Sequence, residues 1–154
     1  MKNLLSFFLS FFLFTGCDEQ EPELKSEIGH FELKVTYIIN TLPGQFPDEG
    51  SKMYLFSDQA KCPDFYEAMQ GFARIDGKTV TSRYRARVDE NGEIFMYNIK
   101  ADSYYMVVVS SFHERYTEKI IEVPLGDTLK LHKNFSNSAK YWHDLEPWDY
   151  VKPQ

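Results

Sequence analysis

The chain has 154 residues, 23 acidic against 17 basic side chains, a formal net charge of −6 and an aromatic content of 16%. Its length fits a single domain. An acidic protein gains nothing from the release of counterions by a phosphate backbone, so the charge argues against nucleic acid as a partner. The two cysteines, Cys17 and Cys62, are too few for a framework of several disulfides.

Residues 1–16 have the pattern of a lipoprotein signal peptide. An apolar run at 4–14 is followed by the small residues Thr15 and Gly16 and then by Cys17. The run fits the roughly 7 to 15 residues of a signal-peptide core and is shorter than the ~20 residues that span a bilayer. The segment resembles the precursors of bacterial lipoproteins. We therefore expect cleavage before Cys17, acylation of Cys17 and attachment to a membrane through the lipid.

Residues 17–27, the acylated cysteine and the acidic stretch after it, are expected to form a solvated tether because they are almost without apolar side chains. In lipoproteins of the Bacteroidetes type, an acidic stretch at this place resembles the signal for the outer face of the outer membrane. The same residues also fit a plain linker. The expected location is thus the outer membrane, with the cell surface as one alternative.

Residues 28–135 carry the patterns of a β domain. Alternating or continuous apolar residues predict seven strands, at 30–39, 52–56, 79–88, 94–99, 104–110, 119–123 and 128–133. The apolar run at 104–110 indicates a central strand buried on both sides. Asn91–Gly92 is the strongest hairpin signal, so the strand at 94–99 is expected to pair with the strand before it.

The segment 58–71 interrupts the β pattern. Phe65, Met69 and Phe72 follow one another at spacings of four and three residues, and Gly71 is placed to end a helix. These spacings predict one short helix that packs against the core.

The ordered set of these segments resembles the carboxypeptidase regulatory-like family. The resemblance rests on the strand Lys52-Met53-Tyr54-Leu55-Phe56, the turn and strand Asp89-Glu90-Asn91-Gly92-Glu93-Ile94-Phe95-Met96, and the strand Tyr104-Tyr105-Met106-Val107-Val108. It implies a mainly β fold, a seven-strand Ig-like (transthyretin-like) Greek-key sandwich with one short helix in an insertion. It also implies a role in binding, stabilising or spacing.

Nothing in the sequence predicts catalysis, a cofactor or a metal site. Hydroxyisourate hydrolases share the fold and end in Tyr-Arg-Gly-Ser, whereas this chain ends in Tyr150-Val151-Lys152-Pro153-Gln154. His113-Glu114 is the nearest approach to a zinc motif and has no second histidine nearby. The enzyme alternative is a small hydrolase, in which His113, Glu114 and three arginines converge in one pocket.

Those arginines, Arg83, Arg85 and Arg87, alternate along one predicted strand face. Such a face is either a docking surface for a carboxylate, a sulfate or an acidic glycan, or a solvated face that offsets nearby acids.

In the tail, residues 136–154, the aromatic residues are mixed with acids. Trp142 and Trp148 either pack along the sandwich or form a platform for a sugar or a partner protein. Packing is favoured because two exposed tryptophans promote aggregation.

The sequence thus predicts a non-enzymatic, lipid-anchored module that binds an outer-membrane protein or a glycan. A passive spacer without a specific ligand is the other non-catalytic alternative, and it requires both tryptophans to be buried.

Overall fold

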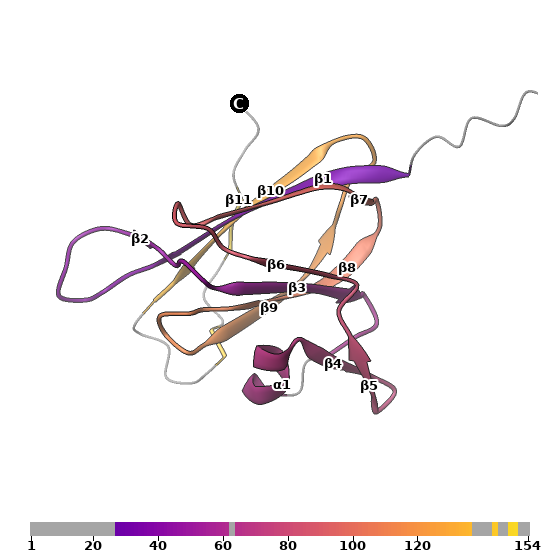
Figure 1. The fold of residues 1–154 in the computed structure, drawn as a ribbon, viewed down its shortest axis with the longest axis horizontal. Coiled ribbons are helices and arrows are strands. Elements are labelled where there is room, and N and C mark those ends of the chain that lie inside the picture. The colour runs from indigo at the N-terminus through magenta and orange to yellow at the C-terminus, as the bar shows by residue number, and fades with distance from the viewer. Residues whose placement is uncertain (1–26, 62–63, 137–142, 145–147, 151–154) are drawn as a thin grey trace, which may run out of the picture.

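Two β-sheets pack face to face in the computed structural model, which describes residues 27–61, 64–136, 143–144 and 148–150 (Figure 1). The first sheet contains β1 (Ile28–Tyr37), β2 (Phe46–Pro47), β7 (Glu93–Lys100), β10 (Thr128–Phe135) and β11 (Asp149–Tyr150). The second contains β3 (Lys52–Ser57), β6 (Tyr84–Arg87), β8 (Ser103–Val109) and β9 (Tyr116–Glu122). Within the described residues, seven of these strands have four or more residues. The predicted fold class, a mainly β sandwich with one short helix, is confirmed.

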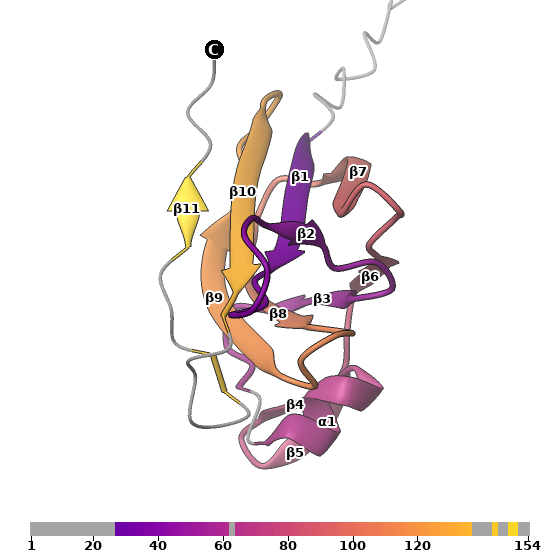
Figure 2. The same cartoon turned by 90° about the vertical axis from the view of Figure 1, so that its left-hand side faces the viewer.

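Strand β1 lies inside the first sheet, beside β10 (Figure 2). It pairs in parallel with β10, where His30 lies opposite Thr128, and antiparallel with β7. Its alternating side chains behave as the period of two predicts, because Phe31, Leu33 and Val35 are buried while the residues between them face outward.

The main core lies between the two sheets. Its buried side chains are Phe31, Leu33, Val35, Met53, Leu55, Val88, Ile94, Ile99, Tyr104, Met106, Val108, Ile121, Val123, Leu131 and Phe135. Fully burying one side chain of this size contributes about 1.5–3 kcal/mol relative to leaving it exposed, so this layer supplies most of the driving force for folding.

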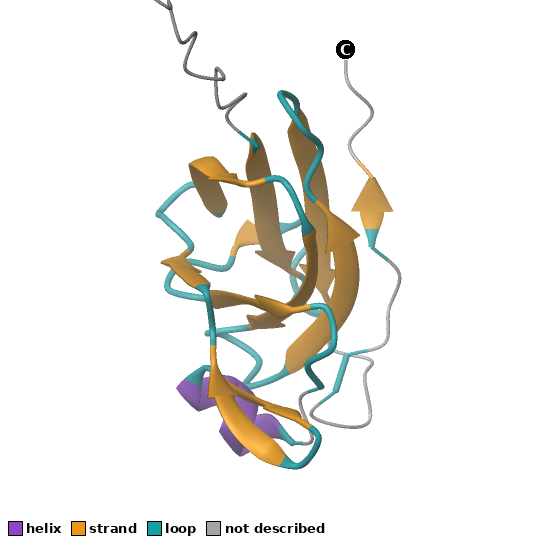
Figure 3. Ribbon diagram, turned by 90° about the vertical axis from the view of Figure 1, so that its right-hand side faces the viewer, coloured by secondary structure: helices purple, strands orange, loops and turns teal. Residues whose placement is uncertain are grey.

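A second apolar layer covers part of the outer face of the second sheet. It is built from the insertion, in which α1 (Phe65–Gln70) is followed by a hairpin of β4 (Phe72–Ile75) and β5 (Lys78–Thr81) (Figure 3). Phe65, Ala68 and Ala73 of the insertion are buried against strands β3, β8 and β9. Strand β8 is therefore buried on both faces, as its continuous apolar run predicts.

The helix α1 confirms the short helix expected in 58–71. Asp64 caps its start by accepting a hydrogen bond of 2.9 Å from the amide of Glu67, and Gly71 ends it with a φ of 74°. Phe65 is buried, but Met69 is 38% exposed, so the predicted apolar stripe is only partly covered.

The strand predicted at 79–88 is wrong, because two strands in different sheets occupy that range. β5 ends at Thr81 and pairs with β4, and β6 begins at Tyr84 and pairs with β3. The chain bends at Arg83, whose amide donates to the carbonyl of Leu55 at 2.7 Å. The alternation continues across the bend, so the sequence pattern gave no sign of the break.

The hairpin expected at Asn91–Gly92 is also wrong in its pairing. The turn itself is present, since the side chain of Asp89 accepts from the amides of Asn91 and Glu93. However, β6 before the turn belongs to the second sheet, and β7 after it pairs with β1 in the first. The turn carries the chain from one sheet to the other. The tight hairpin is instead at Asp76–Gly77, between β4 and β5.

The C-terminal segment joins the edges of both sheets on the side of β9 and β10. His143 forms a parallel bridge with Tyr116 in β9, and β11 pairs antiparallel with β10. Between these two points, Trp148 packs half-buried against the main core.

A fully buried ion pair lies under this segment. The ammonium of Lys133 in β10 is 3.0 Å from the carboxylate of Asp144, and neither side chain is exposed. The same ammonium lies 5.4 Å from the ring centre of Phe135 and 5.8 Å from that of Trp148. The two rings and the carboxylate together replace part of the hydration that the ammonium loses.

Candidate binding surfaces

Two of the predicted site residues, Cys17 and Trp142, lie outside the described residues. Among the helices that the structure describes, none combines the length and apolar character needed to cross a membrane.

Trp148 lies in the packing between the C-terminal segment and the core. Besides Lys133, the ammonium of Lys119 faces its ring at 6.0 Å. The ring is thus partly buried against the core and has two ammonium groups beside it. The structure thus places Trp148 in the position that the packing alternative requires.

The structure separates the three predicted arginines into two groups. Arg83 lies at the bend before β6, where its guanidinium is 3.7 Å from the carboxylate of Asp102. Arg85 and Arg87 lie farther along β6 and face outward on the second sheet. They line a shallow hollow of about 380 Å³ together with Lys52, Tyr54 and Gln70.

The charges of Arg85 and Arg87 act on the hydroxyl of Tyr54. Burial raises the pKa of the Tyr54 hydroxyl, and the positive charges of Arg85 and Arg87 pull it partly back down. The hydroxyl keeps its proton and donates a hydrogen bond of 3.2 Å to the carbonyl of Met69. Tyr54 therefore joins the helix α1 to the sheet while its ring forms part of the hollow.

A second surface, which the sequence analysis missed, lies on the outer face of the first sheet. Phe95 and Tyr97 in β7 are 48% and 63% exposed, and their ring planes are within 7° of parallel at 6.4 Å between centres. The ring of His30 in β1 meets Tyr97 edge-on at 5.7 Å. We call the surface formed by His30, Phe95 and Tyr97 the aromatic face.

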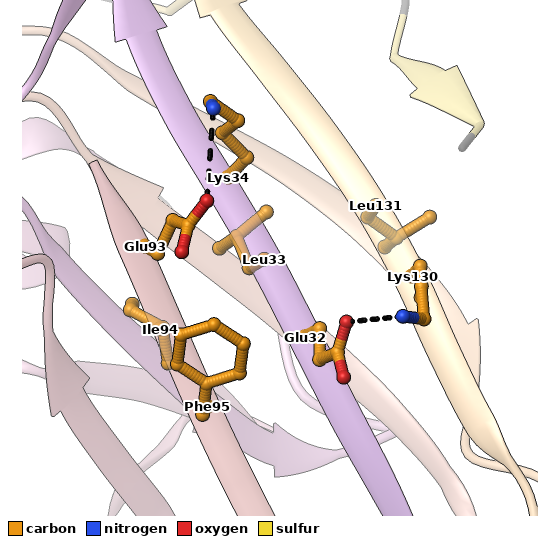
Figure 4. Close-up of a pocket in the computed structure, with 8 residues that line it drawn as sticks. All are labelled: Glu32, Leu33, Lys34, Glu93, Ile94, Phe95, Lys130 and Leu131. Carbon is orange, nitrogen blue, oxygen red and sulfur yellow. Dashed lines mark ion pairs between the residues drawn. The ribbon is translucent and has the colours of Figure 1, made fainter. Parts of the chain in front are cut away.

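Two ion pairs lie near Phe95 of the aromatic face (Figure 4). The ammonium of Lys130 is 2.7 Å from a carboxylate oxygen of Glu32, and that of Lys34 is 3.6 Å from Glu93. The hydrogen bond to Glu32 and its charge raise the pKa of Lys130. Side chains of these pairs and of Phe95 line a shallow hollow of about 190 Å³.

The signal for this surface was present in the sequence. In the predicted strand at 94–99, Phe95 and Tyr97 alternate with the apolar residues Ile94 and Met96. An aromatic pair on the outward positions of a strand is the pattern that marks an exposed aromatic surface. The sequence around Lys52, in contrast, does not predict that this residue lies opposite Arg87, because local sequence does not specify strand pairing.

His113 and Glu114, the residues of the hydrolase alternative, lie in the loop between β8 and β9. The ring of His113 contacts Tyr37 and Phe112, and its Nε2 is 3.2 Å from the carbonyl oxygen of Ile38. These surroundings differ from those of Arg85 and Arg87, which flank Tyr54 on the outer face of the second sheet. Across the described residues, no group of three or more His, Cys, Asp or Glu side chains is arranged to hold a metal ion.

No family model matches the chain, and no curated protein matches it. Among solved structures, it is similar to GBS52, a minor pilin of Streptococcus agalactiae, with 11% identity, coverage of 75% of this chain and 47% of the pilin, and a TM-score of 0.44. It is also similar to BcpA, the major pilin subunit of Bacillus cereus, with 20% identity, coverage of 72% of this chain and 30% of the pilin, and a TM-score of 0.42. The chain spans less than half the length of these pilins. The resemblance to the carboxypeptidase regulatory-like family stays a prediction.

Proposed function

We propose that the protein is a lipid-anchored, non-catalytic module of the cell envelope that binds a partner protein through the aromatic face. The observation that carries this proposal is the exposure of the parallel rings of Phe95 and Tyr97 on a sheet face that no described element covers. Aromatic side chains surrounded by charged ones are the usual composition of a protein-binding surface.

The rest of the sandwich supports this choice of surface. The insertion covers the outer face of the second sheet over β3, β8 and β9, and the C-terminal segment lies along the side of β9 and β10. The separate surroundings of His113 and of the arginines give no support to the hydrolase alternative, which needs them in one pocket. The lipid anchor at Cys17 belongs to the proposal on the strength of the sequence pattern alone.

The packing of Trp148 also favours the passive spacer, so the experiment must separate a binding module from a spacer. We expect cross-linking in intact cells to join the protein to a partner of the outer membrane. Phe95→Ala and Tyr97→Ala should each reduce that product. Leu125→Ala, which truncates another exposed apolar side chain, should leave it unchanged. Equal yields from all of these variants would favour the spacer.

The anchor is tested separately by fractionation. Each buried methylene of an acyl chain contributes about 0.8 kcal/mol to membrane attachment, and several chains together hold a protein stably. Cys17→Ser should therefore move the protein from the membrane fraction to the soluble fraction. Retention of that variant in the membrane would contradict lipid anchoring without deciding whether the aromatic face binds.

A further inference from the structure

We propose that the hollow lined by Lys52, Tyr54, Gln70, Arg85 and Arg87, here called the basic hollow, binds the carboxylate or sulfate groups of an acidic glycan. This site is independent of the aromatic face, which lies on the other sheet.

The strand register brings the cations of the basic hollow together. In the pairing of β3 with β6, Lys52 lies opposite Arg87 and Tyr54 lies opposite Arg85. Side chains two residues apart on a strand point to the same face, so all four emerge on the outer side of the second sheet. Gln70, the last residue of α1, completes the lining from the insertion.

No acid among the described residues neutralises the cations of the basic hollow. Within the part of the chain that the structure describes, no ion pair involves Lys52, Arg85 or Arg87, although the protein carries more acids than bases. Arg83, two residues before Arg85, is paired with Asp102. The sequence also allowed a solvated face whose arginines offset nearby acids. That alternative explains Arg83 but leaves Arg85 and Arg87 unexplained.

Protection of a sheet edge explains only part of the arrangement. β6 is one of the two edge strands of the second sheet as described, and charged side chains on an edge discourage pairing with other chains. Lys52, however, belongs to β3, which is paired on both sides by β6 and β8. Like charges that lie directly opposite each other on paired strands destabilise a sheet. The placement of Lys52 against Arg87 thus opposes folding, and an anionic ligand would reverse that effect.

The composition of the hollow indicates the class of anion. A guanidinium offers parallel N–H donors that match the two oxygens of a carboxylate or sulfate. The Tyr54 ring supplies an apolar surface and the Gln70 amide can bond hydroxyl groups, which together suit a sugar that carries acid groups. The hollow is open, so it can accept a unit inside a long chain. An acidic peptide added to the sheet is less suited, because β6 offers an edge of only four residues.

Binding of the detergent-solubilised full protein to polygalacturonate and to sulfated heparin oligosaccharides tests the proposal. We expect at least one of them to bind, with an affinity that falls as salt is added. Arg85→Gln, Arg87→Gln and Lys52→Gln should each weaken binding by about tenfold, since each removes a charge-assisted hydrogen bond. Arg85→Lys keeps the charge but loses the forked donors, so it should also weaken binding.

Arg83→Gln is the matched control, because it removes the same charge from the same segment at a residue already paired with Asp102. It should change the affinity by less than about twofold. A loss equal to that of Arg85→Gln would mean that net charge alone drives binding and would overturn the site. Failure of both glycans to bind would overturn it as well. Binding of polyglutamate with the same affinity would overturn the assignment to a glycan in favour of an acidic peptide. Binding of neutral dextran that is the same for all variants would show that the site does not recognise acid groups, and would overturn the proposal.

Discussion

At the scale of single residues, the most demanding feature is the buried ammonium of Lys133. Removing a lysine and an aspartate from water costs several kcal/mol per ion, and only a close partner with further polar contacts offsets this. Asp144 provides both, because one oxygen is 3.0 Å from Lys133 and the other accepts from the amide of Ser136 at 3.4 Å. The pair therefore fixes where the C-terminal segment lies on the sandwich.

Lys133→Met should destabilise the protein by about 3–5 kcal/mol, because it leaves the Asp144 carboxylate buried without its counter-ion. The double variant Lys133→Met/Asp144→Leu should recover much of the loss, since an apolar pair of similar volume removes both buried charges. The free energy of unfolding in urea measures both. Lys34→Met, which breaks the exposed pair with Glu93, should cost at most about 1 kcal/mol. Equal losses from Lys133→Met and Lys34→Met would contradict the buried character of the pair.

The raised pKa of the Tyr104 hydroxyl predicts a loss of stability at high pH. Burial and the adjacent Tyr84 raise the pKa of the Tyr104 hydroxyl, which donates a hydrogen bond of 2.8 Å to the carbonyl of Lys100. The unfolded chain releases this proton near pH 10, whereas the folded protein keeps it. The free energy of unfolding should therefore be level below about pH 10 and fall above it.

Tyr104→Phe should make that fall shallower, although it also removes the hydrogen bond and so lowers stability at every pH. Urea titrations from about pH 8 to about pH 11 give the slope. A slope identical to that of the unchanged protein above pH 10 would show that Tyr104 does not contribute.

At this scale, the sequence predicts which face of a strand a side chain occupies better than it predicts which other residue that side chain contacts. The alternation of Leu129, Leu131 and Phe135 already puts Lys133 on the inward face of its strand. Nothing local shows that a carboxylate arrives from Asp144, 11 residues later, to meet it. The arginines show the same limit: Arg83 alternates with Arg85 in sequence, but a bend in the backbone and the carboxylate of Asp102 separate it from the others.

At the scale of elements, a turn does not by itself decide which sheet the following strand joins. Asn91–Gly92 and Asp76–Gly77 carry similar local signals, and both form turns. Only the second joins paired strands, because β7 finds β1 in the other sheet and buries Ile94 against Leu33 there. Backbone preferences therefore predict that the chain reverses, while the burial of whole strand faces determines the partner. This is why strand positions were largely predictable and the pairing of the strand at 94–99 was not.

Gly92→Ala tests the close approach at this crossing. Gly92 has a φ of 82°, and a Cβ there would lie 2.7 Å from the carbonyl oxygen of Val35. Gly77 has a similar φ of 77° with nothing within 4 Å. Both alanine variants should lose about 1 kcal/mol from the backbone conformation, and Gly92→Ala should lose about 1–3 kcal/mol more from the clash. Thermal unfolding of the Gly92→Ala and Gly77→Ala variants compares the two losses. Equal decreases in melting temperature would mean that the backbone at Gly92 relaxes enough to avoid the clash.

At the scale of the whole molecule, strands from opposite ends of the domain complete the first sheet. β1 pairs along its length with β10, so His30 contacts the region of Thr128, and the C-terminal segment then seals the adjacent side. Contacts between distant parts of a chain form slowly, because a long loop must be closed first. Folding therefore cannot be completed until β10 has been made.

Deletion of residues 137–154 should destabilise the sandwich, because it removes both Asp144 and Trp148 from the surroundings of Lys133. In the shortened chain, Lys133→Met should raise the free energy of unfolding, the opposite of its effect in the full chain, since the ammonium no longer has a partner. Urea unfolding of the four proteins measures this reversal of sign. The same sign in both backgrounds would show that the C-terminal segment does not stabilise the ammonium.

The parallel placement of β1 beside β10 also has a mechanical consequence. A pull on the chain before Ile28 acts along β1, which is held by eight residue pairs to β10 and six to β7. Such a force shears both rows of hydrogen bonds at once instead of opening them one after another. A partner held on Phe95 and Tyr97 would sit on β7, one row away from the pulled strand. With the chain anchored as proposed, tension between the membrane and that partner would pass mainly through the first sheet, and the second sheet with its basic hollow would lie outside the direct path of the force.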